Sequence, residues 1–115
     1  MVEKQQYEVV VTKRASLRFD AKILPYLLEN FSLERAIEIE DNLIDFTAKL
    51  SNNPSRGTLE KELKNHIAKY RFILFKETRN IELKIIYHIK EDINRVYVTD
   101  FFPVKMDNKT INLRS

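Results

Sequence analysis

The alternation of apolar and polar side chains is clearest between residues 69 and 102, where it predicts three consecutive β-strands. The expected strands cover residues 69–76, 81–90 and 95–102. They are rich in Val, Ile, Tyr, Phe and Thr, which suit a pleated and half-buried surface. The polar segments 76–80 and 91–94 are short enough for hairpin connections. We therefore expect a three-stranded antiparallel meander.

Each expected strand has two different faces, because successive side chains point to opposite sides of a sheet. In the middle strand, Leu83, Ile85, Tyr87 and Ile89 share one face, and Lys84, Ile86, His88 and Lys90 share the other. In the last strand, Val96, Val98, Asp100 and Phe102 oppose Arg95, Tyr97, Thr99 and Phe101, and in the first strand Tyr70, Phe72 and Leu74 oppose Arg71, Ile73 and Phe75. We expect helices to cover the aliphatic face and function to lie on the mixed, polar one.

Apolar residues at helical spacing predict two helices upstream of these strands, over residues 16–30 and 32–50. Pro25 should either kink the first helix or break it, so that the helix restarts with Pro25 in its first turn; we favour the kink. Ser32 is the expected N-cap of the second helix. In the second helix, a seam of apolar residues recurs at spacings of 3 and 4, namely Ala36, Ile39, Leu43, Phe46 and Leu50. Leu33, Ile37 and Ile44 widen this seam to a stripe suited to a globular core.

A short β-rich run at residues 7–13 precedes the helices, and Pro103 is expected to end the last strand. The predicted order is β-α-α-β-β-β, an α+β fold in which a helical hairpin packs on one face of an antiparallel sheet. A chain of 115 residues is expected to form one domain, residues 1–115. We expect the tail, residues 103–115, to be partly disordered.

The composition argues against several classes of site. The chain has no Cys, so disulfides and thiolate zinc sites are ruled out, and its single glycine, Gly57, cannot supply a glycine-rich phosphate loop. With only two His residues, we expect no metal and no cofactor. No apolar run approaches the roughly 18 residues of a membrane span, and residues 1–6 lack an apolar signal core. We therefore expect a cytoplasmic protein with no membrane partner.

The net charge of +3 conceals an asymmetry between the two halves of the chain. Residues 1–55 carry 7 Lys and Arg against 9 Asp and Glu, whereas residues 56–115 carry 13 against 8. A basic sheet half is the footprint expected for nucleic acid or an acidic partner. The alternative is that these lysines only protect strand edges from aggregation.

Several segments follow one another in an order and spacing that resemble the RelE/ParE superfamily of toxins. They are the opening strand with Lys13-Arg14-Ala15, residues 26–36 of the helical hairpin, the Asn53-Pro54 to Gly57 loop, and strand segments 70–74, 83–87 and 96–102. The resemblance implies the toxin of a bacterial type II toxin–antitoxin module, also labelled a plasmid stabilisation protein. It also implies a cognate antitoxin that lies across the sheet and the helical hairpin.

The superfamily has two activities, and the resemblance leaves both open. One branch consists of mRNA interferases, which cleave mRNA in the ribosomal A site, and the other inhibits DNA gyrase without being a nuclease. The partner beyond the antitoxin is accordingly either mRNA on the ribosome or DNA gyrase. A decayed relative without toxicity is a further alternative.

RNA cleavage without a metal needs a base, a cation for the phosphate and an acid for the leaving oxygen. Lys84 occupies the position at which cleaving members carry an Arg, and His88 titrates in the useful range. These two residues share a face but lie roughly 13 Å apart along the strand. A site would therefore need cationic neighbours, and we name Arg71 and Lys105. The alternatives are a solvated lysine and a half-exposed strand histidine.

Overall fold

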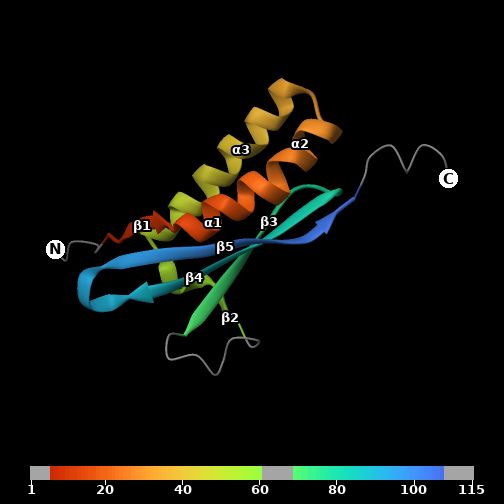
Figure 1. Cartoon of the computed structure of the whole chain (residues 1–115). Coiled ribbons are helices and arrows are strands. Elements are labelled where there is room, and N and C mark those ends of the chain that lie inside the picture. The colour runs from red at the N-terminus through yellow and green to blue at the C-terminus, as the bar shows by residue number, and fades with distance from the viewer. Residues whose placement is uncertain (1–5, 61–68, 108–115) are drawn as a thin grey trace.

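A five-stranded sheet with the order β1-β5-β4-β3-β2 is the base of the computed structural model, and helices cover one of its faces (Figure 1). The structure describes residues 6–60 and 69–107. The strands are β1 (Glu8–Val11), β2 (Thr58–Leu59), β3 (Tyr70–Thr78), β4 (Ile81–Lys90) and β5 (Arg95–Met106). The predicted α+β fold, with helices on one face of a sheet, is confirmed. The short strand β2 is an addition that the sequence pattern did not predict.

Strands β3, β4 and β5 form the expected antiparallel meander. At one edge β2 adds to β3 in antiparallel orientation, whereas at the other edge β1 runs parallel to β5, with Val9 opposite Val96 and Val11 opposite Val98. The sheet is therefore mixed rather than wholly antiparallel. Strands β1 and β5, the first and last in the described part of the chain, are thus neighbours in the sheet.

The middle strand, β4, has the two faces that its sequence predicts. Leu83, Ile85 and Tyr87 are fully buried toward the helices. They pack in one core with the helical residues Ile23, Leu27 and Ile39. Lys84 and His88 lie on the opposite face and are partly exposed. The helices thus leave free the face on which function was expected.

A β-bulge in β5 changes the predicted faces of that strand. Tyr87 pairs with Val98 but Ile86 pairs with Asp100, so Thr99 is the extra residue and the alternation reverses beyond it. Phe101 is consequently buried in the core at 6% exposure, and its ring meets Phe19 edge-on. The prediction that Val96, Val98, Asp100 and Phe102 share a face is therefore wrong.

Strand β5 also continues past Pro103 to Met106, so the prediction that Pro103 ends the strand is wrong. Proline lacks an N–H donor but is tolerated where one side of a strand has no neighbour. In the described part of the chain β1 pairs with β5 only as far as Val98, so Pro103 lies on a free edge. Of the tail expected to be disordered, residues 103–106 form strand, and residues 108–115 lie outside the described part.

The first helical segment is α1 (Lys13–Arg18), a π-helical turn (Phe19–Ile23) and α2 (Leu24–Asn30) in direct succession. It begins earlier than expected because the Thr12 side chain accepts a hydrogen bond from the Ala15 N–H at 3.3 Å. The π-helical turn ends at Ile23, two residues before Pro25, which lies in the first turn of α2. A π-turn shifts the hydrogen-bond pattern by one residue and lets a helix accommodate a disturbance without breaking.

Helix α3 (Leu33–Ala48) begins at the predicted cap, since the Ser32 hydroxyl accepts a hydrogen bond from the Arg35 N–H at 3.1 Å. The predicted seam faces the core, and Ala36, Ile39 and Leu43 are buried. The widened stripe is not core: Leu33, Ile37 and Ile44 are 65%, 50% and 58% exposed. The helix rests on α2 and β3 along its seam, so its flank stays uncovered.

The phenol of Tyr87 joins β4 to the loop before β2. Its hydroxyl donates a hydrogen bond to the Pro54 carbonyl at 2.5 Å and accepts one from the Gly57 N–H at 3.1 Å. Burial raises the pKa of Tyr87, so it remains a neutral donor. A Cβ at position 57 would collide with the Tyr87 hydroxyl and would lie 2.8 Å from the Phe72 carbonyl oxygen. The only glycine in the chain therefore lies where the packing leaves no room for a side chain.

Replacing Tyr87 by Phe should lower the free energy of unfolding by about 1–3 kcal/mol, because the buried Gly57 N–H and Pro54 carbonyl lose their shared partner. Urea unfolding followed by far-UV circular dichroism measures this loss. The matched control is Tyr97→Phe, which removes a half-exposed hydroxyl and should change stability by less than about 0.5 kcal/mol. Equal effects at both positions would contradict a structural role for the Tyr87 hydroxyl.

Candidate functional site

The face of the sheet away from the helices, here called the open face, is the candidate site. Cross-strand pairing places three side chains in each of its rows, one from each strand of the meander. The rows are Tyr70, His88 and Tyr97; Phe72, Ile86 and Asp100; and Leu74, Lys84 and Phe102. Phe102 is 44% exposed and Leu74 40%, so large apolar groups meet solvent between polar ones. Such a mixture on a sheet is typical of a binding surface.

Three aromatic rings form a row across the open face, from β3 through β4 to β5. The His88 ring meets Tyr70 edge-on, with centroids 5.3 Å apart, and stacks on Tyr97 at 5.4 Å with an interplanar angle of 25°. All three residues are half-buried, so part of each ring remains accessible. We call Tyr70, His88 and Tyr97 the aromatic row. It offers flat π surfaces of the kind on which unstacked nucleobases are bound.

The central member of this row, His88, is electrically neutral at pH 7. Burial lowers its pKa below the usual value of 6.5, and the nearby positive charge of Lys90 lowers it further. A neutral imidazole can accept a proton, as the sequence-based hypothesis requires. Its ring is nevertheless held between two tyrosines, which gives it a packing role as well.

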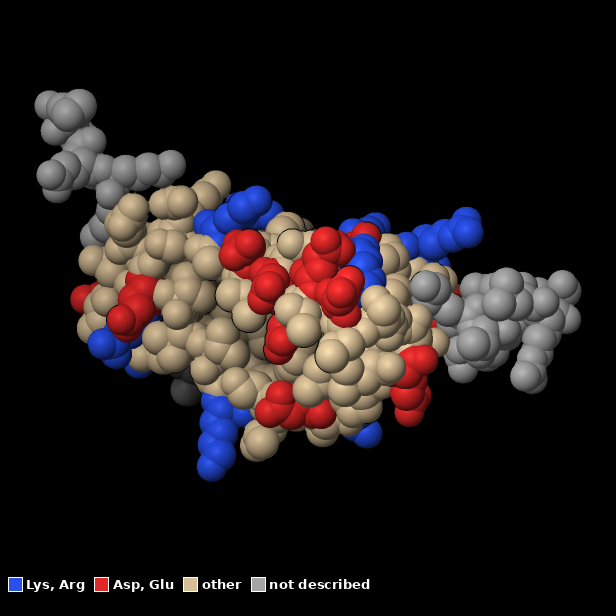
Figure 2. Space-filling model, turned by 90° about the horizontal axis from the view of Figure 1, so that it is seen from above, with Lys and Arg blue, Asp and Glu red and all other residues tan. Residues whose placement is uncertain are grey.

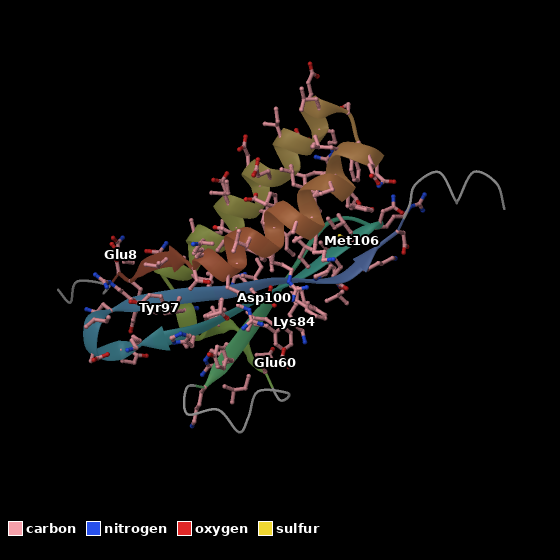
Figure 3. All side chains as sticks on the ribbon, viewed as in Figure 1. Glu8, Glu60, Lys84, Tyr97, Asp100 and Met106 are labelled. Carbon is pink, nitrogen blue, oxygen red and sulfur yellow. The ribbon has the colours of Figure 1, made fainter. Side chains whose placement is uncertain are left out.

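Lys84 reaches across the open face instead of pointing into solvent. Its ammonium nitrogen lies 4.4 Å from the centre of the Phe72 ring and 2.8 Å from a carboxylate oxygen of Glu60, which follows β2. The two side chains are 22% and 6% exposed. Figure 3 shows both on the side of the sheet away from the helices. Lys84, which was expected to contact a phosphate, is therefore already paired with the carboxylate of Glu60.

A second ion pair joins the helix layer to the open face around the edge of β5. The Arg18 guanidinium donates to both carboxylate oxygens of Asp100, at 3.1 and 3.3 Å. It also lies 5.8 Å from the centre of the Phe102 ring. Neither this pair nor Glu60 was found from the sequence, because each contact depends on strand pairings and a bulge that have no local signal.

Neither of the other two predicted site residues lies close to both Lys84 and His88. Arg71 lies opposite Tyr87 on the helix side of the sheet and donates to the Ser55 and Gly57 carbonyls at 3.3 and 2.8 Å. Lys105 lies opposite Glu82 and pairs with Asp107 at 3.6 Å. The six residue steps along β4 from Glu82 to His88 span roughly 20 Å. The four candidates therefore do not converge on one phosphate.

This geometry suits binding better than acid–base chemistry. Stacking rings and partly exposed cations line the open face, but a base and an acid on either side of one phosphate are not found among the described residues. No group of three or more potential metal ligands occurs in the part of the chain that the structure describes. The arrangement can stack flat rings and pair with anions.

A separate pocket of about 380 Å³ opens on the helix side, between α1, the π-helical turn, α3 and β1. Val9, Val11, Leu43 and Phe101 line it with apolar surface, and Asp20 and Glu40 add carboxylates from the two helical segments. Acidic side chains gather around the middle of this side of the molecule (Figure 2). The exposed apolar flank of α3, with Ile44 in the pocket lining, continues this surface.

The chain matches no protein-family model, no curated protein and no solved structure. Among the residues that the structure describes, no helix has the length and apolar character needed to cross a membrane.

The pKa of His88 makes stability depend on pH. Because the folded pKa is lower than 6.5, the unfolded chain binds more protons between the two values, so the free energy of unfolding rises with pH there. The contribution is complete above 6.5 and is lost as the pH falls below it. His88→Phe keeps a ring between Tyr70 and Tyr97 but cannot titrate. Urea unfolding between pH 5 and 8 should therefore show a shallower pH dependence in this variant, and identical profiles would contradict the assignment.

Proposed function

We propose that this chain is the toxin of a bacterial type II toxin–antitoxin module of the RelE/ParE kind, active in the cytoplasm and neutralised by a cognate antitoxin. The proposal starts from the order and spacing of the sequence segments that resemble this superfamily. It is supported by an element order in which β1 precedes a helical hairpin and β3, β4 and β5 follow as a meander. The helices lie on one face of the sheet and leave the other free to meet a target (Figure 1).

The observation that carries the choice of target is the aromatic row beside Lys84. Single-stranded RNA is recognised by stacking unpaired bases on aromatic side chains while cations meet the phosphates. The stacked His88 and Tyr97 rings and the partly exposed Lys84 supply both kinds of contact on one surface. We propose mRNA on the ribosome as the target of the open face.

A second candidate is a toxin that inhibits DNA gyrase by binding alone. The observation that favours it is the separation of the predicted catalytic residues, since Arg71 faces the helix side and Lys105 lies far from His88. A protein that only binds needs no converging acid and base. In this version the open face contacts a protein surface instead of RNA.

For the antitoxin we propose a basic amphipathic segment that binds the helix side. An amphipathic helix docks its apolar face into a hydrophobic groove, and the pocket beside the exposed flank of α3 offers one. The carboxylates of Asp20 and Glu40 in the pocket lining favour cations beside that apolar face. Residues 1–55, with 7 basic and 9 acidic side chains, carry a net negative charge, which would attract a basic segment.

Induced expression in a bacterial host tests the toxin assignment and separates the two targets. We expect growth arrest that co-expression of the neighbouring reading frame relieves. Loss of amino-acid incorporation with intact DNA supercoiling would identify the ribosome-directed toxin, whereas DNA damage with continuing translation would identify the gyrase-directed one. Unimpaired growth at high expression would overturn the toxin proposal and leave the decayed relative.

Tyr97→Leu should weaken binding of a single-stranded RNA to the purified protein by about 1–3 kcal/mol, because one stacking surface of the aromatic row is removed. Fluorescence anisotropy with a labelled ten-nucleotide oligouridylate measures the affinity. Tyr97→Phe is the matched control: it keeps the ring and should bind nearly as well as the original chain. Equal losses in both variants would argue against stacking.

Glu40→Lys should weaken neutralisation by the antitoxin, lowering its affinity roughly fivefold or more, because a cation replaces a carboxylate in the pocket lining. Asp45→Lys makes the same charge change on the same helix, at an exposed position outside that lining, and should have little effect. Growth rescue by co-expression and titration of the purified pair provide the readouts. If Glu40→Lys and Asp45→Lys weaken antitoxin binding equally, the effect comes from net charge alone and the pocket is not the docking site.

A further inference from the structure

Glu60 occupies the position on Lys84 that an anionic ligand of the open face would need. The residue follows β2, in which Thr58 pairs with Phe72 and Leu59 with Arg71. Its N–H donates to the Tyr70 carbonyl at 2.7 Å, which continues this pairing and places Glu60 beside the first member of the aromatic row. Two-residue alternation from Thr58 therefore places its side chain on the open face.

The ion pair lies within the surface proposed to bind RNA. The carboxylate oxygen is 2.8 Å from the Lys84 nitrogen, and the same nitrogen lies over the Phe72 ring at 4.4 Å. Phe72 is the neighbour of Tyr70 two residues along β3, so the pair adjoins the aromatic row. The ammonium group and the stacking rings thus lie on the same face of the sheet, and a single strand needs both kinds of contact, for its phosphates and for its bases.

We propose that the Glu60 carboxylate is an internal competitor for the phosphate of a bound single strand, so that binding exchanges one anion for another on Lys84. This inference rests on the proposed function, because it concerns the ligand of the open face. When a phosphate takes Lys84, Glu60 loses that charge partner, which costs part of the binding free energy. Glu60 thereby lowers the affinity of the open face for anions.

Two further acidic residues that the structure describes on this face differ from Glu60 in ways that make controls possible. Asp100 is held by Arg18, which comes from the helix layer, and Glu82 pairs with the 65% exposed Lys76. Glu82→Gln therefore removes the same charge from the same face without releasing Lys84. A difference between the variants at 60 and 82 reports on the exchange rather than on overall charge.

Combining Glu60→Gln with Lys84→Met separates competition from a purely structural ion pair. If the Glu60 carboxylate acts by occupying Lys84, removing it strengthens anion binding only while the Lys84 ammonium group is present. A change in stability alone would not depend on Lys84 in this way.

The experiment measures binding of the labelled ten-nucleotide oligouridylate at one fixed salt concentration for the full chain and three variants. We expect Glu60→Gln to bind several-fold more tightly, Glu82→Gln to change little, and Glu60→Gln combined with Lys84→Met to lose the gain. Circular dichroism melts check that each variant is folded. If Glu60→Gln does not fold, Glu60→Ala takes its place, since water can then reach Lys84.

The outcomes distinguish this inference from the proposed function. RNA binding by the original chain with equal or weaker binding by Glu60→Gln overturns the inference and makes Glu60 a structural partner of Lys84, while the proposed RNA target stands. A gain that persists in the combination with Lys84→Met also overturns it, because the gain would not act through Lys84. Absence of RNA binding in every variant overturns both.

Discussion

The structure depends on the burial of one face of β4 against the helices. This strand lies between β3 and β5, and every second side chain enters a core that the helices close. Because the period of a strand is two, a fixed register on the helix side also fixes which side chains meet solvent on the other. Lys84 and His88 are therefore held on the open face by the same hydrophobic packing that buries Leu83, Ile85 and Tyr87.

The two sides of the sheet use different chemistry. The helix side combines an apolar pocket with acidic side chains (Figure 2), whereas the open face combines aromatic rings with cations that are paired with Glu60 and Asp100. These ion pairs are partly buried, so solvent screens them less than it screens pairs on an exposed surface. An anionic ligand of the open face must therefore compete with groups that the fold itself supplies.

Much of the fold could be predicted from local pattern. The limits of β4 match the expected residues 81–90, and Ser32 caps α3. The seam residues Ala36, Ile39, Leu43 and Leu50 are buried, and Phe46 is partly buried. The candidate site was predicted only in part. Lys84 and His88 share the open face, but Arg71 belongs to the opposite one because Ile73 and Phe75, at the same parity, carry the apolar face of β3.

The sequence by itself determined which segments are strands and helices and which side of β4 is apolar, because these follow from spacing between near neighbours. Only the tertiary structure decided that β1 runs parallel to β5, that Thr99 forms a bulge, and that the flank of α3 remains exposed. It also brought Glu60 to Lys84 and Arg18 to Asp100, across separations of 24 and 82 residues. Such contacts depend on how distant elements pair and pack, and neither partner carries a local signal of the other.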